Sequence, residues 1–353
     1  MPLLEVSDLS VQFHTEDGVV HAVDGVSYSV ERGKVLGIVG ESGSGKTVGS
    51  LTLLGLTRSK STEVAGTAKF DGQDLLPMSN DELRDIRGNE IGVIFQDPLS
   101  SLHPFFKVGD QLAEAVRTHN RGVSKAAARD RVIESLNQVG IPDPRDRIRA
   151  YPHEFSGGMR QRVMIAMALI NQPKLVIADE PTTALDVTVQ AQILELLDQL
   201  RQETGTAIVM ITHDLGVVAQ MADDIAVMYS GRIVEHAPAR RIFEDPEHPY
   251  TWGLLRSIPR LTAPRGEELV PISGRPPSLI NRPSGCHFHP RCPYVREAHT
   301  RVDPDLVPAE GDPNHRVRCL LPATRRRALW AKLRAGATPE QALESVPGEE
   351  ATL

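Results

Sequence analysis

Residues 35–47 read Val-Leu-Gly-Ile-Val-Gly-Glu-Ser-Gly-Ser-Gly-Lys-Thr, and the fold class can be predicted from them. The apolar run Val35–Val39 predicts a buried strand, and a helical pattern follows Thr47. Between the two lies the spacing G-x-x-x-x-G-K-[ST], in the strand–loop–helix context that a phosphate-binding loop requires. We therefore predict an α/β domain, a P-loop NTPase, built on a mostly parallel sheet.

The loop has the composition that phosphate binding needs. Its glycines allow backbone N–H groups to curl around phosphate oxygens, and the following helix directs its positive end at the same place. Lys46 would contact the β- and γ-phosphates with its positive charge, and the Thr47 hydroxyl would bind Mg²⁺. The predicted phosphate-binding residues are Gly40, Ser42, Gly43, Ser44, Gly45, Lys46 and Thr47.

Four further strands are predicted at Ile91–Phe95, Leu175–Ala178, Ala207–Ile211 and Ile225–Met228. Polar residues follow the first three of them. Gln96, the pair Asp179-Glu180 and His213 each follow such a run, and the carboxyl ends of parallel strands share one edge where ligands bind. We expect Asp179 to hold Mg²⁺ together with Thr47 and Gln96. Glu180 could orient and deprotonate the attacking water. A single histidine such as His213 is more often structural, but the other polar residues at the strand ends beside the phosphate loop favour a functional role.

The composition excludes several classes of protein. Of 353 residues, 39 are Lys or Arg and 46 are Asp or Glu, which gives a net charge of −7 and argues against a general nucleic-acid binder. No apolar run approaches the ~20 residues of a membrane span, and no signal peptide opens the chain. We expect a soluble, cytosolic protein.

The stretch Phe155-Ser156-Gly157-Gly158-Met159-Arg160-Gln161 resembles the LSGGQ signature of ATP-binding cassette (ABC) ATPases. The order of motifs is also that of the family: phosphate loop, Gln96, signature, Asp179-Glu180, Ala184-Leu185-Asp186 and His213. The resemblance implies a head-to-tail dimer with ATP between each phosphate loop and the partner's signature residues Ser156, Gly157 and Gly158. It assigns Glu180 as general base, His213 to the γ-phosphate, Gln96 as a sensor of the nucleotide and the membrane partner, and Phe13 as the ring that stacks on adenine.

Two further stretches narrow the resemblance to the ATPases of di- and oligopeptide importers. They are the run from Glu180 to Gln192 and the segment Asp245-Pro-Glu-His-Pro-Tyr250. The resemblance implies two transmembrane permease subunits, an extracytoplasmic binding protein, and a place on the cytoplasmic face of the inner membrane. The alternatives are the same machinery for nickel, glutathione or another small solute, or a soluble regulatory or repair ATPase.

The chain is longer than one cassette. We expect an ABC nucleotide-binding domain at 1–255, with a RecA-like core, an antiparallel β subdomain and a helical subdomain at about 97–165. A proline-rich extension would follow at 256–323, and a basic helix with a flexible, frayed tail at 324–353, the last fifteen residues being the tail.

The three cysteines of the chain all lie in or near this extension. Relatives of the subfamily often carry four cysteines there, which resemble an iron–sulfur ligand set; here the residues in those places are Cys286, Cys292, His299 and Cys319. The predicted occupant is a [4Fe–4S] cluster, with Zn²⁺ or no metal as alternatives. His287, His289 and His315 are alternative ligands.

Overall fold

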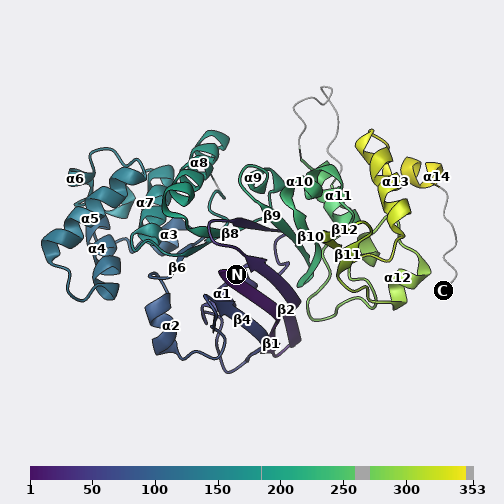
Figure 1. Ribbon diagram of the computed structural model, residues 1–353, viewed down its shortest axis with the longest axis horizontal. Coiled ribbons are helices and arrows are strands. Elements are labelled where there is room, and N and C mark those ends of the chain that lie inside the picture. Colours follow the sequence, from purple (N-terminus) through teal and green to yellow (C-terminus); the bar gives the residue numbers. More distant parts are fainter. Residues whose placement is uncertain (184, 259–270, 347–353) are drawn as a thin grey trace.

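A computed structural model describes residues 1–183, 185–258 and 271–346 (Figure 1). Ala184, Pro259, Pro264 and the end of the predicted tail (347–353) lie outside these ranges.

The centre of the molecule is an eight-stranded sheet in the order β11-β12-β10-β9-β3-β8-β7-β6. Strands β3, β6, β7, β8 and β9 run parallel to their neighbours among themselves, whereas β10, β11 and β12 pair antiparallel. All five strands predicted in the core are present, with ends shifted by at most one residue. The bounds are β3 Val35–Val39, β6 Ile91–Ile94, β7 Leu175–Asp179, β8 Ala207–Thr212, β9 Asp224–Tyr229, β10 Arg232–Pro238, β11 Val307–Ala309 and β12 Asp312–Val317.

Both faces of this sheet are buried, which explains the continuous apolar runs of its strands. Successive side chains of a strand point to opposite faces, so Leu36 and Ile38 join one hydrophobic cluster while Val35 and Val39 join another. The first cluster lies between the central sheet and a four-stranded antiparallel sheet of order β2-β1-β4-β5. That second sheet, at the bottom of Figure 1, comprises β1 Leu4–Thr15, β2 Gly18–Val30, β4 Thr62–Phe70 and β5 Gln73–Asp74.

Helices form a separate lobe at the left of Figure 1. The lobe contains α3 Pro98–Ser101, α4 Val108–His119, α5 Lys125–Gln138, α6 Pro144–Arg147, a 3-10 turn at Pro152–Glu154, and α7 Gly157–Leu169. Helix α5 matches the helix predicted between Ser124 and Gly140, and the Ser124 hydroxyl caps it by accepting from the Ala127 N–H. The remaining core helices are α1 Lys46–Leu53, α2 Asn80–Ile86, α8 Val187–Thr204 and α9 Leu215–Val218.

The segment after β10 packs into the core. Its elements are α10 Ala239–Glu244, α11 Pro249–Arg256, a 3-10 turn at His289–Arg291, α12 Glu297–Arg301, the strands β11 and β12, α13 Ala323–Arg334 and α14 Pro339–Ser345. Composition predicted an irregular region, and the two strands that extend the central sheet were not foreseen. Trp252, Tyr294 and Trp330 centre a third hydrophobic cluster beneath α13 and α14.

The expectation of a frayed tail from residue 339 is wrong for α14. Thr338 accepts from the Gln341 N–H, the Gln341 side chain accepts from the Thr338 N–H, and Ala342 is buried. This reciprocal cap and the buried contact stabilise a short helix that polar composition alone conceals.

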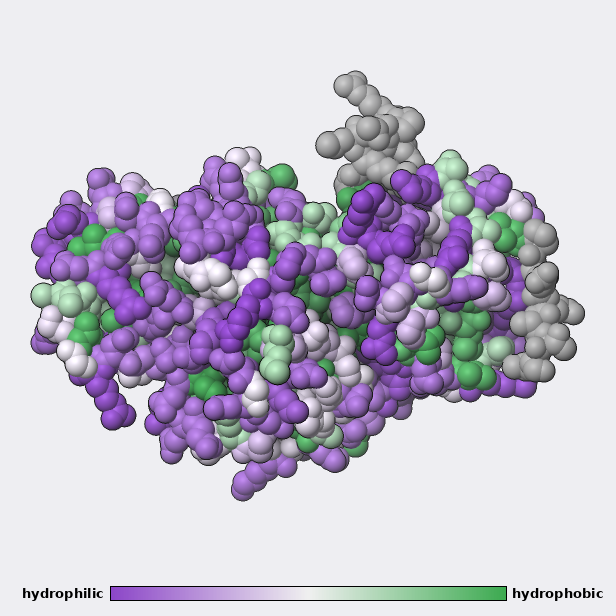
Figure 2. All heavy atoms as spheres, viewed as in Figure 1, coloured by the Kyte–Doolittle hydropathy of each residue, from purple (hydrophilic) through white to green (hydrophobic). Residues whose placement is uncertain are grey.

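The face of the molecule seen in Figure 2 is largely hydrophilic. Within the described ranges, no helix has both the length and the apolar composition needed to cross a membrane.

Candidate nucleotide site

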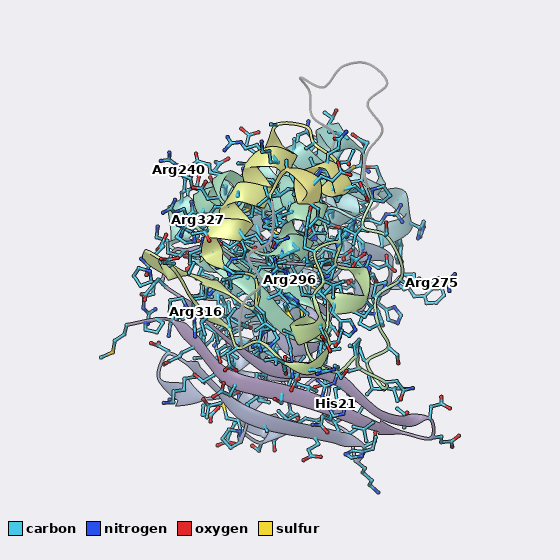
Figure 3. The ribbon with its side chains drawn as sticks, turned by 90° about the vertical axis from the view of Figure 1, so that its right-hand side faces the viewer. His21, Arg240, Arg275, Arg296, Arg316 and Arg327 are labelled. Atoms are coloured by element: carbon cyan, nitrogen blue, oxygen red, sulfur yellow. The ribbon has the colours of Figure 1, made fainter. Side chains whose placement is uncertain are left out.

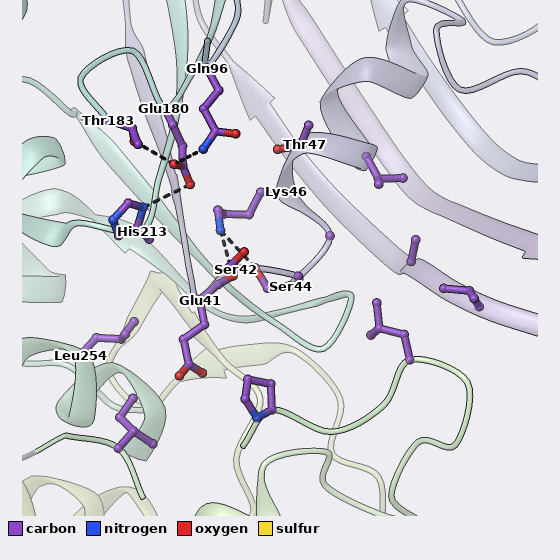
Figure 4. A pocket seen from close by; sticks show the side chains of 18 of the residues that line it. Glu41, Ser42, Ser44, Lys46, Thr47, Gln96, Glu180, Thr183, His213 and Leu254 are labelled. Carbon is purple, nitrogen blue, oxygen red and sulfur yellow. Dashed lines mark hydrogen bonds and ion pairs between the residues drawn. The ribbon is translucent and has the colours of Figure 1, made fainter. Parts of the chain in front are cut away.

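The phosphate loop opens into a cavity of about 1040 Å³ between the antiparallel sheet, the ends of the central strands and the extension (Figure 4). Ten predicted site residues line this cavity: Phe13, Ser42, Gly43, Ser44, Gly45, Lys46, Thr47, Gln96, Glu180 and His213. They come from β1, the phosphate loop and the start of α1, and the ends of β6, β7 and β8. Parallel strands thus bring distant polar residues to one edge, as the sequence predicts.

Two glycines of the loop are required by close backbone contacts. A Cβ on Gly40 would lie 2.1 Å from the Met228 carbonyl oxygen, and one on Gly45 would lie 2.1 Å from that of Ala22. Gly45 also has a φ of 98°, in the left-handed region that disfavours side chains. The curled shape of the loop, with N–H groups free to face an anion, therefore depends on glycine here.

Lys46 lies at the start of α1 and is buried. Its Nζ donates to the Gly40 carbonyl at 2.7 Å and to the Glu41 carbonyl at 3.0 Å. Burial lowers the pKa of Lys46, while the carboxylates of Glu180 and Asp179 oppose the shift. A cation so placed is available to phosphate oxygens held by the loop.

Thr47 and Asp179, which the sequence predicts as ligands of Mg²⁺, contact each other. The Thr47 hydroxyl donates to Asp179 Oδ1 at 3.0 Å, and this joins the loop to the end of β7. Burial raises the pKa of Asp179, and the Thr47 hydrogen bond opposes that shift. Hydroxyl and carboxylate oxygens are ligands that Mg²⁺ prefers, so the donor set fits the ion.

Glu180 is the centre of a hydrogen-bonded cluster (Figure 4). Its Oε2 accepts from Gln96 Nε2 at 3.0 Å and from the Thr183 hydroxyl at 2.8 Å, and its Oε1 lies 3.1 Å from His213 Nδ1. Burial alone would raise the pKa of Glu180, but the hydrogen bonds from Thr183 and His213 outweigh it, so the pKa is lowered. The carboxylate is therefore ionised at neutral pH and can accept a proton from water.

An unusual backbone conformation orients the Glu180 carboxylate. Glu180 has a φ of 46°, unusual for a residue other than glycine, and its N–H donates to the Ile211 carbonyl at 2.8 Å. Such strain persists where surrounding contacts enforce it, and it is concentrated at functional sites.

The signature residues lie away from this cavity. Ser156 and Gly157 are exposed at the start of α7, where the Ser156 hydroxyl caps the helix by accepting from the Met159 N–H. The next turn is tied to the site, because the buried Gln161 donates to the Pro181 carbonyl at 2.5 Å. Within one chain, the structure does not bring Ser156, Gly157 and Gly158 to the phosphate loop.

Sequence reasoning missed part of the cavity wall. Thr183 could have been found, because it follows Glu180 in the Glu-Pro-Thr-Thr run. The wall residues of α11 and of the extension carry no comparable local signal. They are Leu254, Ser257, Pro271, Ile272, Pro276 and Leu279.

The predicted metal ligands of the extension do not form a metal site. Across the described ranges, no group of three or more His, Cys, Asp or Glu side chains is placed to hold a metal ion. Burial, and then the neighbouring Cys319 and Cys286, raise the pKa of the Cys292 thiol, and burial raises that of Cys319 to about 12. His299 Nε2 is buried and, among the described residues, has no hydrogen-bond partner.

Two of the three alternative ligands, His315 and His289, contact other groups. His315 pairs with the buried Glu235 at 2.7 Å, and His289 Nδ1 lies 2.9 Å from the Cys286 carbonyl. Burial lowers the pKa of His287 to about 4.

Comparisons with known proteins agree with this geometry. Residues 23–183 match the family model described as ABC transporter, and residues 234–298 match the one described as oligopeptide/dipeptide transporter, C-terminal region. The chain is 51% identical over 320 residues to the dipeptide transport ATP-binding protein DppD of Bacillus subtilis, covering 90% of this chain and 94% of the relative. It is 50% identical over 319 residues to the oligopeptide transport ATP-binding protein OppD of Mycobacterium tuberculosis, covering 90% of this chain.

The chain spans only 52%, about half, of the length of that mycobacterial relative. Among solved structures, an ATP-binding cassette in a dimeric post-hydrolysis state bound to ADP and Pi aligns with a TM-score of 0.61 and 27% identity. The alignment covers 67% of this chain and 99% of that one.

Proposed function

The chain belongs to the family of ABC transporter ATP-binding proteins, and from that premise we propose that it is the ATP-hydrolysing subunit of an importer for oligopeptides or dipeptides. The observation that carries the ATPase assignment is the Glu180 carboxylate, held by Gln96, Thr183 and His213 beside a complete phosphate loop. The peptide assignment rests on the relatives and on the matching C-terminal region.

In this proposal the chain's own residues divide the work of hydrolysis. The loop N–H groups and Lys46 bind the phosphates, and Thr47 with Asp179 would hold Mg²⁺, which when bound neutralises charge on the β- and γ-phosphates. Gln96 is a further expected ligand of the ion. Glu180 orients and deprotonates the attacking water, while His213 contacts the γ-phosphate.

A second cassette is needed to complete the site. Ser156 and Gly157 are exposed and do not line the cavity of their own chain, which supports a head-to-tail pairing in which they reach the partner's phosphates. The partner would be an identical or homologous ATPase subunit, and closure of the pair would precede hydrolysis.

Exposed aromatic side chains support docking to membrane subunits. Phe105 and Phe106 are 81% and 57% exposed between α3 and α4, and Phe95, which is 40% exposed, precedes Gln96. Such exposed apolar groups typically mark an interaction surface. We place two transmembrane permease subunits here, at the cytoplasmic face of the membrane, supplied by an extracytoplasmic binding protein.

The substitution Glu180→Gln tests the proposed catalysis. It preserves the shape of the side chain, replaces one accepting oxygen by an NH₂ donor and removes the proton acceptor, so we expect ATP turnover to fall by about 10²–10⁴-fold while ATP binding and dimer closure persist. Phosphate release and nucleotide binding measure the two properties, and normal turnover would exclude Glu180 as the base. Ligand screening of the cognate binding protein distinguishes peptides from nickel, glutathione or another solute.

We also propose a metal site in the extension. The neighbouring thiols of Cys286, Cys292 and Cys319 and the His299 Nε2, which has no hydrogen-bond partner among the described residues, support a [4Fe–4S] cluster or Zn²⁺, although in this structure the described side chains do not converge around an ion. Iron, sulfide and zinc analysis of anaerobically purified protein decides the matter. Absence of both metals would remove the proposal.

A further inference from the structure

One arginine of the extension joins the phosphate loop to the extension's part of the cavity wall. Arg291 Nη1 and Nη2 donate to the two carboxylate oxygens of Glu41 at 2.6 and 3.0 Å. The Arg291 side chain is 3% exposed, and Glu41 occupies the second position of the phosphate loop. Figure 4 shows the Glu41 carboxylate pointing away from Lys46, toward the extension.

The same guanidinium also fixes the wall. Arg291 Nε donates to the Ser273 carbonyl at 3.0 Å, and Nη2 donates to the Ile272 carbonyl at 3.3 Å. Ile272 lines the nucleotide cavity. Four hydrogen bonds from one planar, rigid group therefore couple two segments about 230 residues apart in sequence, an arrangement that lysine could not reproduce.

Aromatic packing holds the pair in place. The Arg291 guanidinium carbon lies 5.8 Å from the centre of the Tyr229 ring, and the Tyr250 hydroxyl accepts from the Glu41 N–H at 2.9 Å. The two tyrosine rings are 4.7 Å apart. Tyr229 ends β9 and Tyr250 lies in the first turn of α11, so the ion pair is supported by two elements of the cassette.

A second anchor fastens the wall to the antiparallel sheet. The His21 N–H donates to the Leu279 carbonyl at 3.1 Å, and Arg282 pairs with Asp24. His21 is labelled in Figure 3, at the junction between this sheet and the extension. Leu279 lines the cavity, and Phe13 pairs in register with Val20, next to His21. The extension thus contacts both the phosphate loop and the strands that carry the predicted adenine-stacking ring.

We propose that Arg291 is a positioning residue of the nucleotide site, which holds the phosphate loop through Glu41 and makes the extension contribute to nucleoside triphosphate affinity within the same chain. This inference rests on the proposed function, since it concerns the same site. Arg291 acts through Glu41 and the wall, and it touches none of the reacting atoms.

The test is a double-mutant cycle with Arg291→Met, Glu41→Gln and the double variant. Each single variant should weaken binding of a fluorescent ATP derivative by about fivefold or more, and the double variant should lose less than the product of the two, because coupled neighbours are not additive. In steady-state ATP hydrolysis the variants should show a raised KM for ATP, with kcat little changed. The matched control is Arg301→Gln, which removes an extension arginine whose pair with Glu297 is exposed on both sides.

Unchanged affinity in Arg291→Met protein with the wild-type melting temperature, or strictly additive losses, would overturn the inference. Arg291→Lys serves where the methionine variant does not fold: it keeps the charge but loses the two-pronged contact, so a partial loss of affinity is expected and full affinity would contradict the inference. Wild-type protein that binds no nucleotide would overturn the proposed function itself, which distinguishes the two failures.

Discussion

Acidification from pH 7 to pH 5 is expected to cost the folded protein about 2 kcal/mol through one residue, His248. This histidine caps the N-terminus of α11 and is 1% exposed. Its ring Nδ1 accepts from the Tyr250 N–H at 3.0 Å, and its backbone N–H donates to Glu235 Oε2 at 3.1 Å. Burial, followed by the charge of Arg326, lowers the pKa of His248 to about 3 from the model-peptide value of 6.5.

The sign and size follow from proton linkage. A histidine whose folded-state pKa is depressed contributes stability that is present above its unfolded pKa and is lost as the pH falls, since the unfolded chain takes up the proton first. With values of about 3 and 6.5 for the folded and unfolded chains, the loss between pH 7 and pH 5 is about 2 kcal/mol. At pH 5 the folded chain still keeps this ring neutral, so the loss is set by protonation of the unfolded state.

Urea unfolding at both pH values measures the effect. Other buried histidines also titrate, so the informative quantity is the difference between wild type and His248→Asn, whose side-chain oxygen can still accept from the Tyr250 N–H. The acid-induced loss should be about 2 kcal/mol smaller in that variant and unchanged in His153→Asn, an exposed control. An equal loss in His248→Asn and wild type would show that His248 does not cause the acid-induced loss of stability.

Three further outcomes are expected. Gly40→Ala should abolish nucleotide binding in a folded protein, because its Cβ would lie 2.1 Å from the Met228 carbonyl oxygen; calorimetric titration with MgATP measures this, and normal affinity would contradict the close contact. Thr47→Val should raise the Mg²⁺ concentration needed for half-maximal turnover, and an unchanged magnesium dependence would remove this hydroxyl from the metal site. Arg326→Met should destabilise the chain by about 2 kcal/mol in urea unfolding, because it removes the 2.6 Å partner of the buried Glu247 carboxylate and leaves only the Arg327 contact at 3.2 Å; a loss below about 0.5 kcal/mol would show that the pair adds little.

The central strands and their catalytic ends could be predicted because both depend on short-range pattern. A fully buried parallel strand is a continuous apolar run, and the polar residue after it marks the ligand-binding edge, as Asp179 and Glu180 illustrate. Helix α14 also had a local signal, the Thr338-to-Gln341 capping spacing, which its polar composition concealed.

The extension could not be predicted in the same way, because its order depends on contacts distant in sequence. Strand β12 reads Asp-Pro-Asn-His-Arg-Val, which carries no apolar alternation, and it forms by pairing with β10 at Glu235 and His236. Likewise, nothing beside Arg291 in the sequence indicates that its partner is Glu41. The family resemblance implied a ligand set of Cys286, Cys292, His299 and Cys319, but neither the resemblance nor the spacing determines how these side chains converge.

The pairing of β12 with β10 has a consequence for the integrity of the chain. Without β12, the outermost strand of the central sheet would present unpaired N–H and C=O groups, which are a template for association with other chains. A fragment ending at residue 255 would carry every catalytic residue and yet be prone to aggregate through this edge. The extension therefore shields the edge of the sheet, and we expect the cassette to aggregate less when the extension is attached.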